Sequence, residues 1–400
     1  MNDHSTKQKF QKSFTQQEAI PDEGIRQAVE ILGTGKLHRY NTGEGETSEV
    51  AQLETEYAKW QGSRYCLAVT SGGQAIQIAL RAVGVRPGDK VLANAYTLAP
   101  VPGAIHAVGA KPVFVEIDDD WLTDLDDLRA KAESSGAKYL LLSHMRGHIC
   151  DMDRVVEICD ELGIKLIEDC AHTMGAKWRG ARSGNFGAVA CFSTQTYKHM
   201  NSGEGGLLTT DDAEIAARAT IMSGSYMLYP RHGASPPAEA FEKIRLENPN
   251  CSARLDNLRA AILRAQLPNL DANIKRWNER YQALEAGLAD APNIRVVPRN
   301  QAEFYVGSSF QFHVDAGAQQ IIDFVARCYA RGVEIKWFGA EEPAGFTSRY
   351  DSWKYFGELP ELPKTLSVLA TTCDVRVPLT FSLADCALIA QIIGEEAAQI

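Results

Sequence analysis

The pattern of hydrophobic and polar positions predicts alternating strands and helices over the first half of the chain. Between about residues 48 and 210, short β-branched or aliphatic runs alternate with segments of helical periodicity. Near-continuous apolarity in the short runs is typical of strands covered on both faces, and hence of a mostly parallel sheet. The predicted strands are residues 65–69, 90–93, 111–117, 139–142, 165–169, 188–193 and 206–210, and the predicted helices are residues 50–60, 74–83, 100–108, 122–132 and 153–162.

The second half of the chain has a different pattern. Residues 225–250 are rich in Tyr and Pro, which predicts an irregular loop and a candidate substrate-facing segment. Long helical periodicity follows, then an alternating run that predicts a half-exposed strand, and two further helices. These elements are residues 255–288, 310–314, 319–331 and 384–399. We therefore predict an α/β fold with a large domain over residues 1–254 and a small α+β domain over residues 255–400.

Composition limits the class of protein. The 400 residues carry a formal net charge of −10, which argues against a surface for nucleic acid or for an anionic membrane. No apolar run approaches the roughly 20 residues that span a bilayer. The nine cysteines are scattered and never spaced as Cys-x-x-Cys, so neither a disulfide framework nor a structural zinc site is expected. Together these features predict a cytoplasmic protein.

Lys198 is the first candidate for chemistry. It follows the predicted strand of residues 188–193 and precedes a glycine-rich run, Gly203-Glu204-Gly205-Gly206. A lysine amine becomes nucleophilic near neutral pH when burial lowers its pKa, and a short segment between buried strands supplies that desolvation. Lys198 could then hold a cofactor as a Schiff base. A lysine that merely caps a loop would fit the same position.

Two further candidates stand near the end of a predicted strand. Asp169 ends the strand of residues 165–169, and ligands of open α/β sheets bind at that edge. A carboxylate there either forms an ion pair at the rim of the core or holds a cationic group such as a protonated pyridine nitrogen. His172, three residues later, is placed to approach the same ring.

Two strand ends offer groups that could bind other parts of a cofactor. Ser71-Gly72-Gly73 joins a predicted strand to a predicted helix, where backbone N–H groups and the helix dipole could hold a phosphate. An ordinary strand-to-helix turn is the alternative. The next strand brings Tyr96-Thr97-Leu98 to the same edge, and these side chains could cover one face of a cofactor.

Several short motifs occur in a fixed order along the chain. They are Ser71-Gly72, Gly109-Ala110-Lys111-Pro112-Val113-Phe114-Val115, Ile167-Glu168-Asp169-Cys170-Ala171-His172, Gly184-Asn185-Phe186-Gly187, Phe192-Ser193, and Lys198 with Gly203-Glu204-Gly205-Gly206. As an ordered set they resemble the DegT family of pyridoxal-phosphate-dependent aminotransferases, whose best-known members aminate keto sugars. The resemblance extends from about Gly43 to Arg376-Val377-Pro378-Leu379.

The resemblance implies a fold-type I aminotransferase and a role for each motif. Lys198 would form the Schiff base with pyridoxal 5'-phosphate, and Asp169 would pair with the pyridine nitrogen. Ser193 and the Ser71-Gly72-Gly73 turn would bind the phosphate, and His172 would lie near the phenolic oxygen of the ring. The family also implies a homodimer with sites at the subunit interface.

The implied reaction uses two small molecules in turn. An amino acid donor, with glutamate or glutamine expected, would leave pyridoxamine phosphate in the site. Lys198 would serve as the base and acid of the proton transfer. A carbonyl acceptor, expected to be a keto sugar, a cyclitol or a related small ketone or aldehyde, would then take the amino group.

Three residues depart from the family pattern. Gly73 replaces a threonine, which removes one hydroxyl from the phosphate site, and Leu98 stands where an aromatic ring usually stacks on the cofactor. Ser252 takes the place of an asparagine that reaches the phosphate of the neighbouring subunit, and its reach is shorter. These departures suggest a divergent branch that acts on something other than a nucleotide sugar.

Other readings stay open at this point. In the sugar dehydratase branch of the same superfamily a histidine replaces the lysine, and His199 is adjacent to Lys198. A non-catalytic regulatory protein could use the same scaffold. A nicotinamide dehydrogenase is disfavoured because no Gly-x-Gly-x-x-Gly follows the first strand. Metal catalysis is also disfavoured, because the glycine in Met145-Arg146-Gly147 would interrupt a helix carrying His144 and His148.

Overall fold

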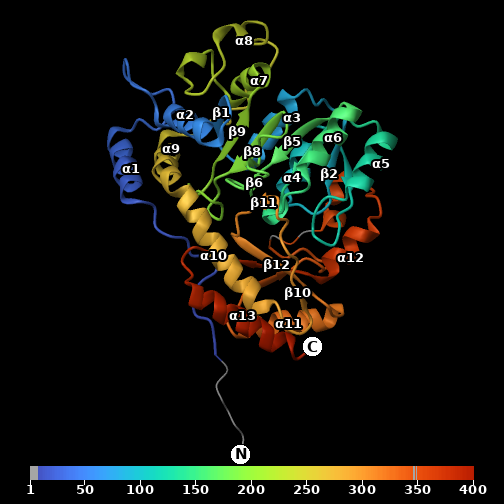
Figure 1. Ribbon diagram of the computed structural model, residues 1–400. Helices are drawn as coiled ribbons and strands as arrows, with labels where there is room; N and C mark the ends of the chain where they lie inside the picture. Colours follow the sequence, from blue (N-terminus) through green and yellow to red (C-terminus); the bar gives the residue numbers. More distant parts are fainter. Residues whose placement is uncertain (1–7, 346, 348) are drawn as a thin grey trace, which may run out of the picture.

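The computed structural model describes residues 8–345, 347 and 349–400. Figure 1 shows a large α/β part above and a smaller part below, with the long helix α10 (Leu270–Leu288) running from one to the other. The first seven residues of the predicted 1–254 domain lie outside the described residues. The boundary after residue 254 stays a prediction.

A seven-stranded sheet forms the centre of the large part. Its strands follow the order β1-β9-β8-β5-β4-β2-β3, and all of them except β9 point the same way. The predicted mostly parallel sheet is therefore confirmed. The strands are β1 (Tyr65–Val69), β2 (Lys90–Asn94), β3 (Lys111–Val115), β4 (Tyr139–Ser143), β5 (Lys165–Asp169), β8 (Val189–Ser193) and β9 (Gly206–Thr210).

Helices cover both faces of this sheet, which explains the near-continuous apolarity of its strands. Alternate strand residues enter two cores: Cys66 and Ala68 face one, and Leu67 and Val69 face the other. On the first face lie α2 (Glu49–Gln61), α5 (Leu125–Ser135), α6 (Met152–Leu162) and α9 (Asn257–Gln266). On the second face lie α3 (Gly72–Ala82), α4 (Pro100–Ala107) and α7 (Ala213–Ser223).

The smaller part contains an antiparallel four-stranded sheet in the order β10-β12-β14-β13. Residues of α10, α11 and α13 share a hydrophobic core with it. The strands are β10 (Ile294–Arg295), β12 (Ser309–Val314), β14 (Thr372–Arg376) and β13 (Ile335–Trp337), and the remaining helices are α11 (Ala318–Ala330), α12 (Pro363–Thr371) and α13 (Leu383–Ala397).

The prediction of a half-exposed strand at residues 310–314 was wrong, because every residue of β12 is buried. Its polar side chains have partners in the interior. Gln311 donates to Asp374 at 2.7 Å, and the ring of His313 stacks on Trp121 at a centroid distance of 4.5 Å. Polarity alternates along this strand because its second face packs against the large part of the chain rather than water.

The predicted helix over residues 255–288 is divided in two. Pro268 lies in a 3₁₀ turn, η3 (Leu267–Asn269), between α9 and α10. Proline lacks the N–H that a continuous helix would use, so the chain changes its hydrogen-bonding pattern there.

The segment of residues 225–250 is largely irregular, with η2 (Tyr229–Arg231) and the five-residue helix α8 (Ala238–Glu242). Its rings of Tyr229 and Phe241 stack at 4.0 Å, and Phe241 is buried against Ile221 of α7. Its own small core therefore holds it in place. It lies with α7 and α8 at the top of Figure 1.

Several short elements were not predicted. A three-stranded sheet joins residues far apart in the sequence, and a helix precedes α2. These elements are α1 (Asp22–Thr34), β6 (Lys177–Trp178), β7 (Ala181–Arg182) and β11 (Glu303–Phe304). The two-residue strands are too short to leave a periodic signal.

A buried ion pair fixes the segment before α2. Arg39 donates to both carboxylate oxygens of Glu54, at 2.8 and 2.9 Å, and both side chains are fully buried. His232 contacts Arg39 at 2.9 Å, so the cluster also holds the start of the 225–250 segment. Burial alone would raise the pKa of Glu54, but Arg39 and His232 hold it well below its usual value.

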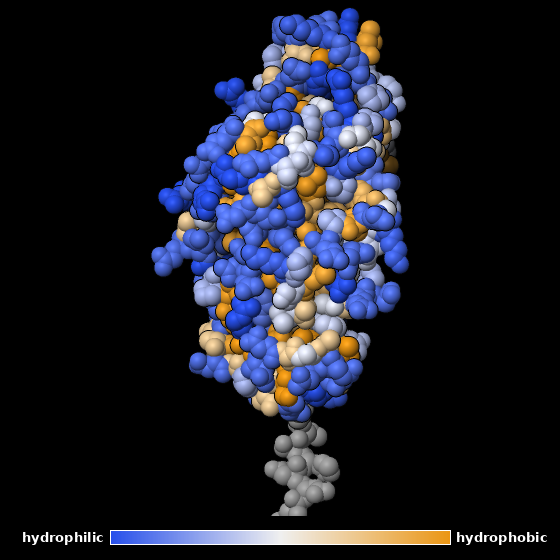
Figure 2. Space-filling view, turned by 90° about the vertical axis from the view of Figure 1, so that its right-hand side faces the viewer, coloured by the Kyte–Doolittle hydropathy of each residue, from blue (hydrophilic) through white to orange (hydrophobic). Residues whose placement is uncertain are grey.

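Hydrophilic residues cover most of the face shown in Figure 2, with hydrophobic residues interspersed among them. Scattered apolar residues are normal on a protein surface. Among the described residues, no helix combines the length and apolar character needed to cross a membrane.

Candidate active site

A cavity of about 420 Å³ opens at the carboxyl ends of the central strands. A smaller hollow of about 80 Å³ adjoins it and shares Lys198, His172 and Ser193 with it. Most of the candidate cofactor residues line one or both spaces: Ser71, Gly72, Gly73, Leu98, Asp169, His172, Ser193 and Lys198. Tyr96, Thr97 and Ser252 line neither.

Lys198 lies in the turn between β8 and β9, where its N–H donates to the carbonyl of Gln195 at 2.8 Å. Its Nζ is 2.8 Å from Nε2 of His172. Burial lowers the pKa of Lys198 to about 7, and the positive charges of Arg146 and Arg376 act in the same direction. A substantial fraction of the amine is therefore neutral and nucleophilic at neutral pH.

The ring of His172 is held in one tautomer. The backbone N–H of Arg146 donates to Nδ1 of His172 at 3.3 Å, which places the hydrogen of a neutral ring on Nε2. Burial and the nearby Lys198 hold the pKa of His172 well below its usual value, so the ring is neutral. Nε2–H then donates to the lone pair of a neutral Lys198 amine.

Asp169 ends β5, beside Ser143 at the end of the parallel strand β4. Ser143 Oγ donates to one carboxylate oxygen at 2.9 Å, and the N–H of Ala171 donates to the other at 3.1 Å. Only 6% of Asp169 is exposed. This carboxylate is thus oriented by two donors and can still accept a bond from a cationic ring.

The first turn of α3 meets β8 at close range. Ser71 caps the helix and accepts from the N–H of Gln74 at 3.1 Å, while Gly72 and Gly73 begin the helix. A Cβ on Gly72 would lie 2.8 Å from Cβ of Ser193, so glycine permits this approach. The N–H groups at a helix start have no carbonyl partner within the helix, and together with Ser193 they suit an anionic group.

Two arginines that the sequence analysis did not select also line the cavity. Arg146 belongs to η1 (Met145–Gly147), just after β4, and Arg376 ends β14 and lies over the ring of Tyr197 at 3.8 Å. Each was visible in the sequence, Arg146 between two histidines and Arg376 within the last family motif. Nothing in their local sequence indicates that they meet, since the folding of the small part onto the large one brings them together.

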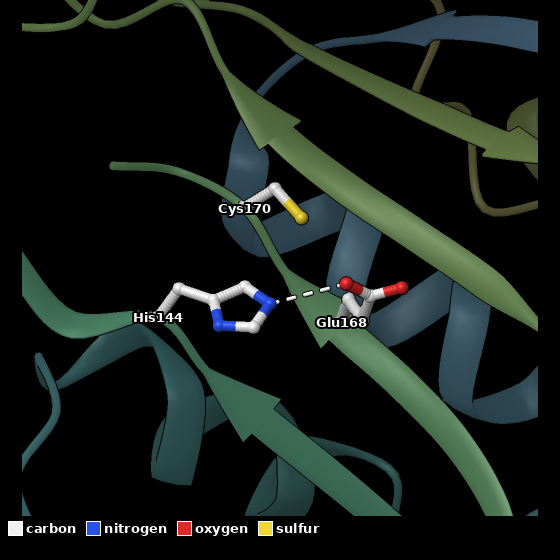
Figure 3. Close-up of side chains that lie close together, drawn as sticks. All are labelled: His144, Glu168 and Cys170. Atoms are coloured by element: carbon white, nitrogen blue, oxygen red, sulfur yellow. Dashed lines mark hydrogen bonds and ion pairs between the residues drawn. The ribbon is translucent and has the colours of Figure 1, made fainter. Parts of the chain in front are cut away.

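A buried cluster of His144, Glu168 and Cys170 lies beside the site (Figure 3). Glu168 accepts from His144 at 3.1 Å and from the N–H groups of Gly184, Phe186 and Gly187 at 2.8 to 2.9 Å. Burial also raises the pKa of the Cys170 thiol well above its usual value. The Glu168 carboxylate already accepts hydrogen bonds on both oxygens, and the Cys170 thiol stays protonated. The cluster is therefore better described as a hydrogen-bonded part of the core than as a metal site.

Comparison with known proteins places this geometry in a family. The model of the DegT/DnrJ/EryC1/StrS aminotransferase family matches residues 22–361. The chain belongs to this family.

Curated relatives agree with the assignment. The chain is 36% identical over 252 residues to dTDP-3-amino-3,4,6-trideoxy-alpha-D-glucose transaminase of Streptomyces venezuelae, covering 62% of each chain. It is 34% identical over 239 residues to 3-amino-5-hydroxybenzoate synthase of Amycolatopsis mediterranei (strain S699), covering 59% of each chain. These matches thus span about three fifths of the relatives' length.

A solved structure extends the likeness to nearly the whole fold. DesV of S. venezuelae, in complex with a ketimine intermediate, superposes with a TM-score of 0.79 at 26% sequence identity. The comparison covers 94% of this chain and 95% of DesV. The DegT-type α/β fold predicted from the sequence is therefore confirmed.

The departures from the DegT family pattern have different structural settings. Leu98 lines the cavity, whereas the neighbouring Tyr96 is buried against Phe338 at a ring distance of 5.2 Å. In the segment Tyr96-Thr97-Leu98, Leu98 is thus the side chain placed to cover a face of the cofactor. Gly73 adds backbone but no hydroxyl to the wall of the cavity.

Ser252 is not brought to the cavity of its own chain. It is exposed, its backbone is left-handed with φ 54°, and its hydroxyl accepts from Arg254 at 2.8 Å. The 225–250 segment is also separate, since none of the described residues that line the large cavity belongs to it. A role for either in the site would require a second subunit.

Proposed function

We propose that this chain is a pyridoxal-phosphate-dependent aminotransferase in which Lys198 holds the cofactor. The observation that carries the proposal is the contact of Lys198 Nζ with His172 at 2.8 Å, in a cavity that also presents Asp169 and the start of α3. Burial lowers the pKa of that amine to about 7, as a Schiff-base lysine requires.

The donor set fits the proposed cofactor at three places. Asp169 offers a buried, oriented carboxylate for a protonated ring nitrogen. Gly72 leaves the backbone beside Ser193 open to a phosphate. The hydrogen on His172 Nε2, which bonds the free Lys198 amine, would pass to a phenolic oxygen once that amine is linked to the cofactor. When bound, pyridoxal phosphate supplies an electron-withdrawing ring that stabilises negative charge on the substrate carbon.

The residues of the chain supply the proton transfer. Once Lys198 is displaced by the amino donor, its free amine has a pKa suited to removing and returning a proton near neutral pH. His172 is neutral and holds the amine through Nε2, which restricts the directions in which that amine can point.

The substrates proposed are an amino acid donor, glutamate or glutamine, and a carbonyl acceptor of small size, a keto sugar, a cyclitol or a related ketone or aldehyde. Support comes from the relatives, one of which is named for a deoxysugar transaminase activity and another for synthesis of an aminobenzoate. The relatives are named for different products, which agrees with a family in which site residues vary, as Gly73, Leu98 and Ser252 do in this chain.

The dehydratase alternative requires a histidine in place of the lysine. His199 is buried, contacts Ser308 at 3.0 Å and packs on Trp277 at a ring distance of 5.2 Å. Lys198 and His199 both line a neighbouring cavity with Trp277, but of the two only Lys198 also lines the site. This arrangement favours transamination.

We also propose a homodimer. Helix α1 exposes an apolar stripe, with Ile25 at 47%, Val29 at 63% and Leu32 at 58% exposure. Positions 25, 29 and 32 follow the spacing of one helix face, and a second copy of the chain would cover it. Such a partner could also bring Ser252 to a neighbouring site.

The decisive experiment is a half-reaction with the purified, cofactor-loaded protein. Glutamate or glutamine should abolish the visible absorption of the lysine-linked cofactor, and a carbonyl acceptor should restore it. Lys198→Ala should show neither change. The proposal would be refuted if the wild type lacked this absorption or if Lys198→Ala kept full transamination activity. Bound cofactor that undergoes no half-reaction would favour a regulatory protein.

A further inference from the structure

The wall of the large cavity carries more positive than negative charge. Arg146 and Arg376 line it beside Lys198, whose amine is partly neutral, and Lys336 lies just behind, with its Nζ 3.5 Å from Asp374. Among the described residues that line this cavity, Glu204 is the only acid, and it is exposed. Asp169 faces the adjoining hollow, where its carboxylate would pair with the ring nitrogen of the proposed cofactor.

A single buried carboxylate, Asp374, contacts two of these cations, Arg146 and Lys336. Asp374 is fully buried; one oxygen accepts from Gln311 at 2.7 Å, and the other lies 3.2 Å from Nη2 of Arg146. Neither Nε nor Nη2 of Arg146 has an aligned hydrogen-bond partner. Arg376 is held by its stacking on Tyr197 rather than by an acid. Arg146 and Arg376 together therefore carry about one positive charge more than Asp374 neutralises.

We propose that Arg146 and Arg376 bind a carboxylate of the carbonyl acceptor, so that the acceptor is an oxo acid. The inference rests on the proposed aminotransferase function. An arginine presents several N–H donors in a planar fork that matches a carboxylate.

The donor and the acceptor occupy the same cavity in turn. Both therefore meet Arg146 and Arg376. An amino acid donor would satisfy the arginines with its own carboxylate. A neutral acceptor would then cover Arg146 and Arg376 without replacing that partner, and covering a positive charge that Asp374 does not neutralise is costly. An acceptor with a carboxylate in the same place avoids this cost.

The position of the arginines favours a carboxylate over a larger phosphate-bearing group. Arg146 is 7% exposed; it and Arg376 line the same cavity as Lys198, and their charges act on the Lys198 amine. The anionic group must therefore lie close to the reacting carbon. The cavity of about 420 Å³ must also hold the cofactor, which leaves room for a compact group only.

Binding to the cofactor-loaded protein provides the first test. Calorimetry should detect succinate and not its neutral analogue succinamide. Arg376→Gln should weaken succinate binding roughly 10-fold to 100-fold, as expected for loss of a charge-assisted hydrogen bond. Arg376→Lys should retain part of the affinity, and Arg129→Gln, on the distant helix α5, should retain all of it.

Acceptor preference provides the second test, with protein loaded with pyridoxamine phosphate. We expect kcat/KM for 4-oxobutanoate to exceed that for butanal at least tenfold in the wild type and to lose that advantage in Arg376→Gln. Dihydroxyacetone phosphate should show no comparable advantage over dihydroxyacetone.

The outcomes separate this inference from the proposed function. Equal use of the charged and neutral aldehydes, a preference for the phosphate, or succinate binding unchanged in Arg376→Gln would overturn the oxo-acid inference. Loss of the donor half-reaction in the wild type would instead overturn the aminotransferase proposal, and the succinate measurement would still report on the arginines.

Discussion

The Nζ atom of Lys198 lies 2.8 Å from Nε2 of His172, and the pKa of each group is lowered. Burial is the main cause for both. Since each group disfavours the charge of the other, the pair is neutral over a pH range in which an isolated lysine would be fully protonated. The neutral, nucleophilic form of Lys198 thus accompanies the His172 tautomer that carries its hydrogen on Nε2.

The first prediction concerns the pH dependence of cofactor attachment. Because the pKa of Lys198 is lowered to about 7, its amine is protonated below that pH and neutral above it. The rate at which pyridoxal phosphate reattaches to the apo-protein should rise about tenfold per pH unit below 7 and level off above it. Absorbance after rapid mixing measures this rate. A rise that continues to pH 10 would contradict the assignment.

Asp169→Asn should leave the fold intact and impair the chemistry. The amide is similar in size but cannot hold a proton on the ring nitrogen, so kcat of the donor half-reaction should fall roughly 100-fold or more. Ser143→Ala, which removes one donor to Asp169, should cost much less. Comparable losses in both variants would argue that the segment is merely disrupted.

Gly72→Ala should weaken cofactor binding. The added methyl would lie 2.8 Å from Cβ of Ser193, which forces the start of α3 away from β8. Gly103→Ala in α4 is the matched control, because a Cβ there meets nothing within 4 Å. Equilibrium titration with pyridoxal phosphate should show at least a tenfold higher Kd for the first variant only. Equal Kd values would show that the turn does not hold the phosphate.

Arg39→Met should destabilise the protein by about 3–5 kcal/mol, since it leaves Glu54 buried without its partner. Lys36→Met, from the exposed pair with Glu46, is the control and should change the free energy of unfolding little. Urea unfolding measures both. The prediction fails if the two variants unfold alike.

The same ion pair predicts a loss of stability in acid. The pKa of Glu54 is lower in the folded protein than in the unfolded chain, so its contribution is complete above the unfolded value of about 4.3 and is lost as pH falls towards the folded value. Wild type should therefore lose more stability than Arg39→Met between pH 5 and pH 3. Parallel losses would contradict the role of the pair.

Val29→Asp should weaken the proposed dimer. A charge within the apolar stripe of α1 would have to be desolvated on association. Light scattering after size exclusion should show monomers at concentrations where the wild type is a dimer. Ile322→Asp, at an exposed apolar position of α11, should leave the mass unchanged. A wild type that is already monomeric would refute the proposed homodimer.

The sequence predicted the sheet and most groups around Lys198 because each stands at a strand end, and parallel strands end at one edge. Arg146 and Arg376 lack such a signal. They lie 230 residues apart in sequence, on elements that meet only when β14 packs near η1. For the same reason, β12 seemed half exposed from its alternation, since its buried polar partners, such as Asp374, come from distant segments.

Glu168 and Asp169 are adjacent carboxylates with opposite tasks. Successive side chains of a strand point to opposite faces, and Glu168 is fixed by His144 and three backbone donors. A shift of β5 by one residue would put the wrong acid in each place. The buried glutamate therefore fixes the register of the strand, and redesign of the cofactor pocket must preserve it even though it lines neither the cavity nor the adjoining hollow.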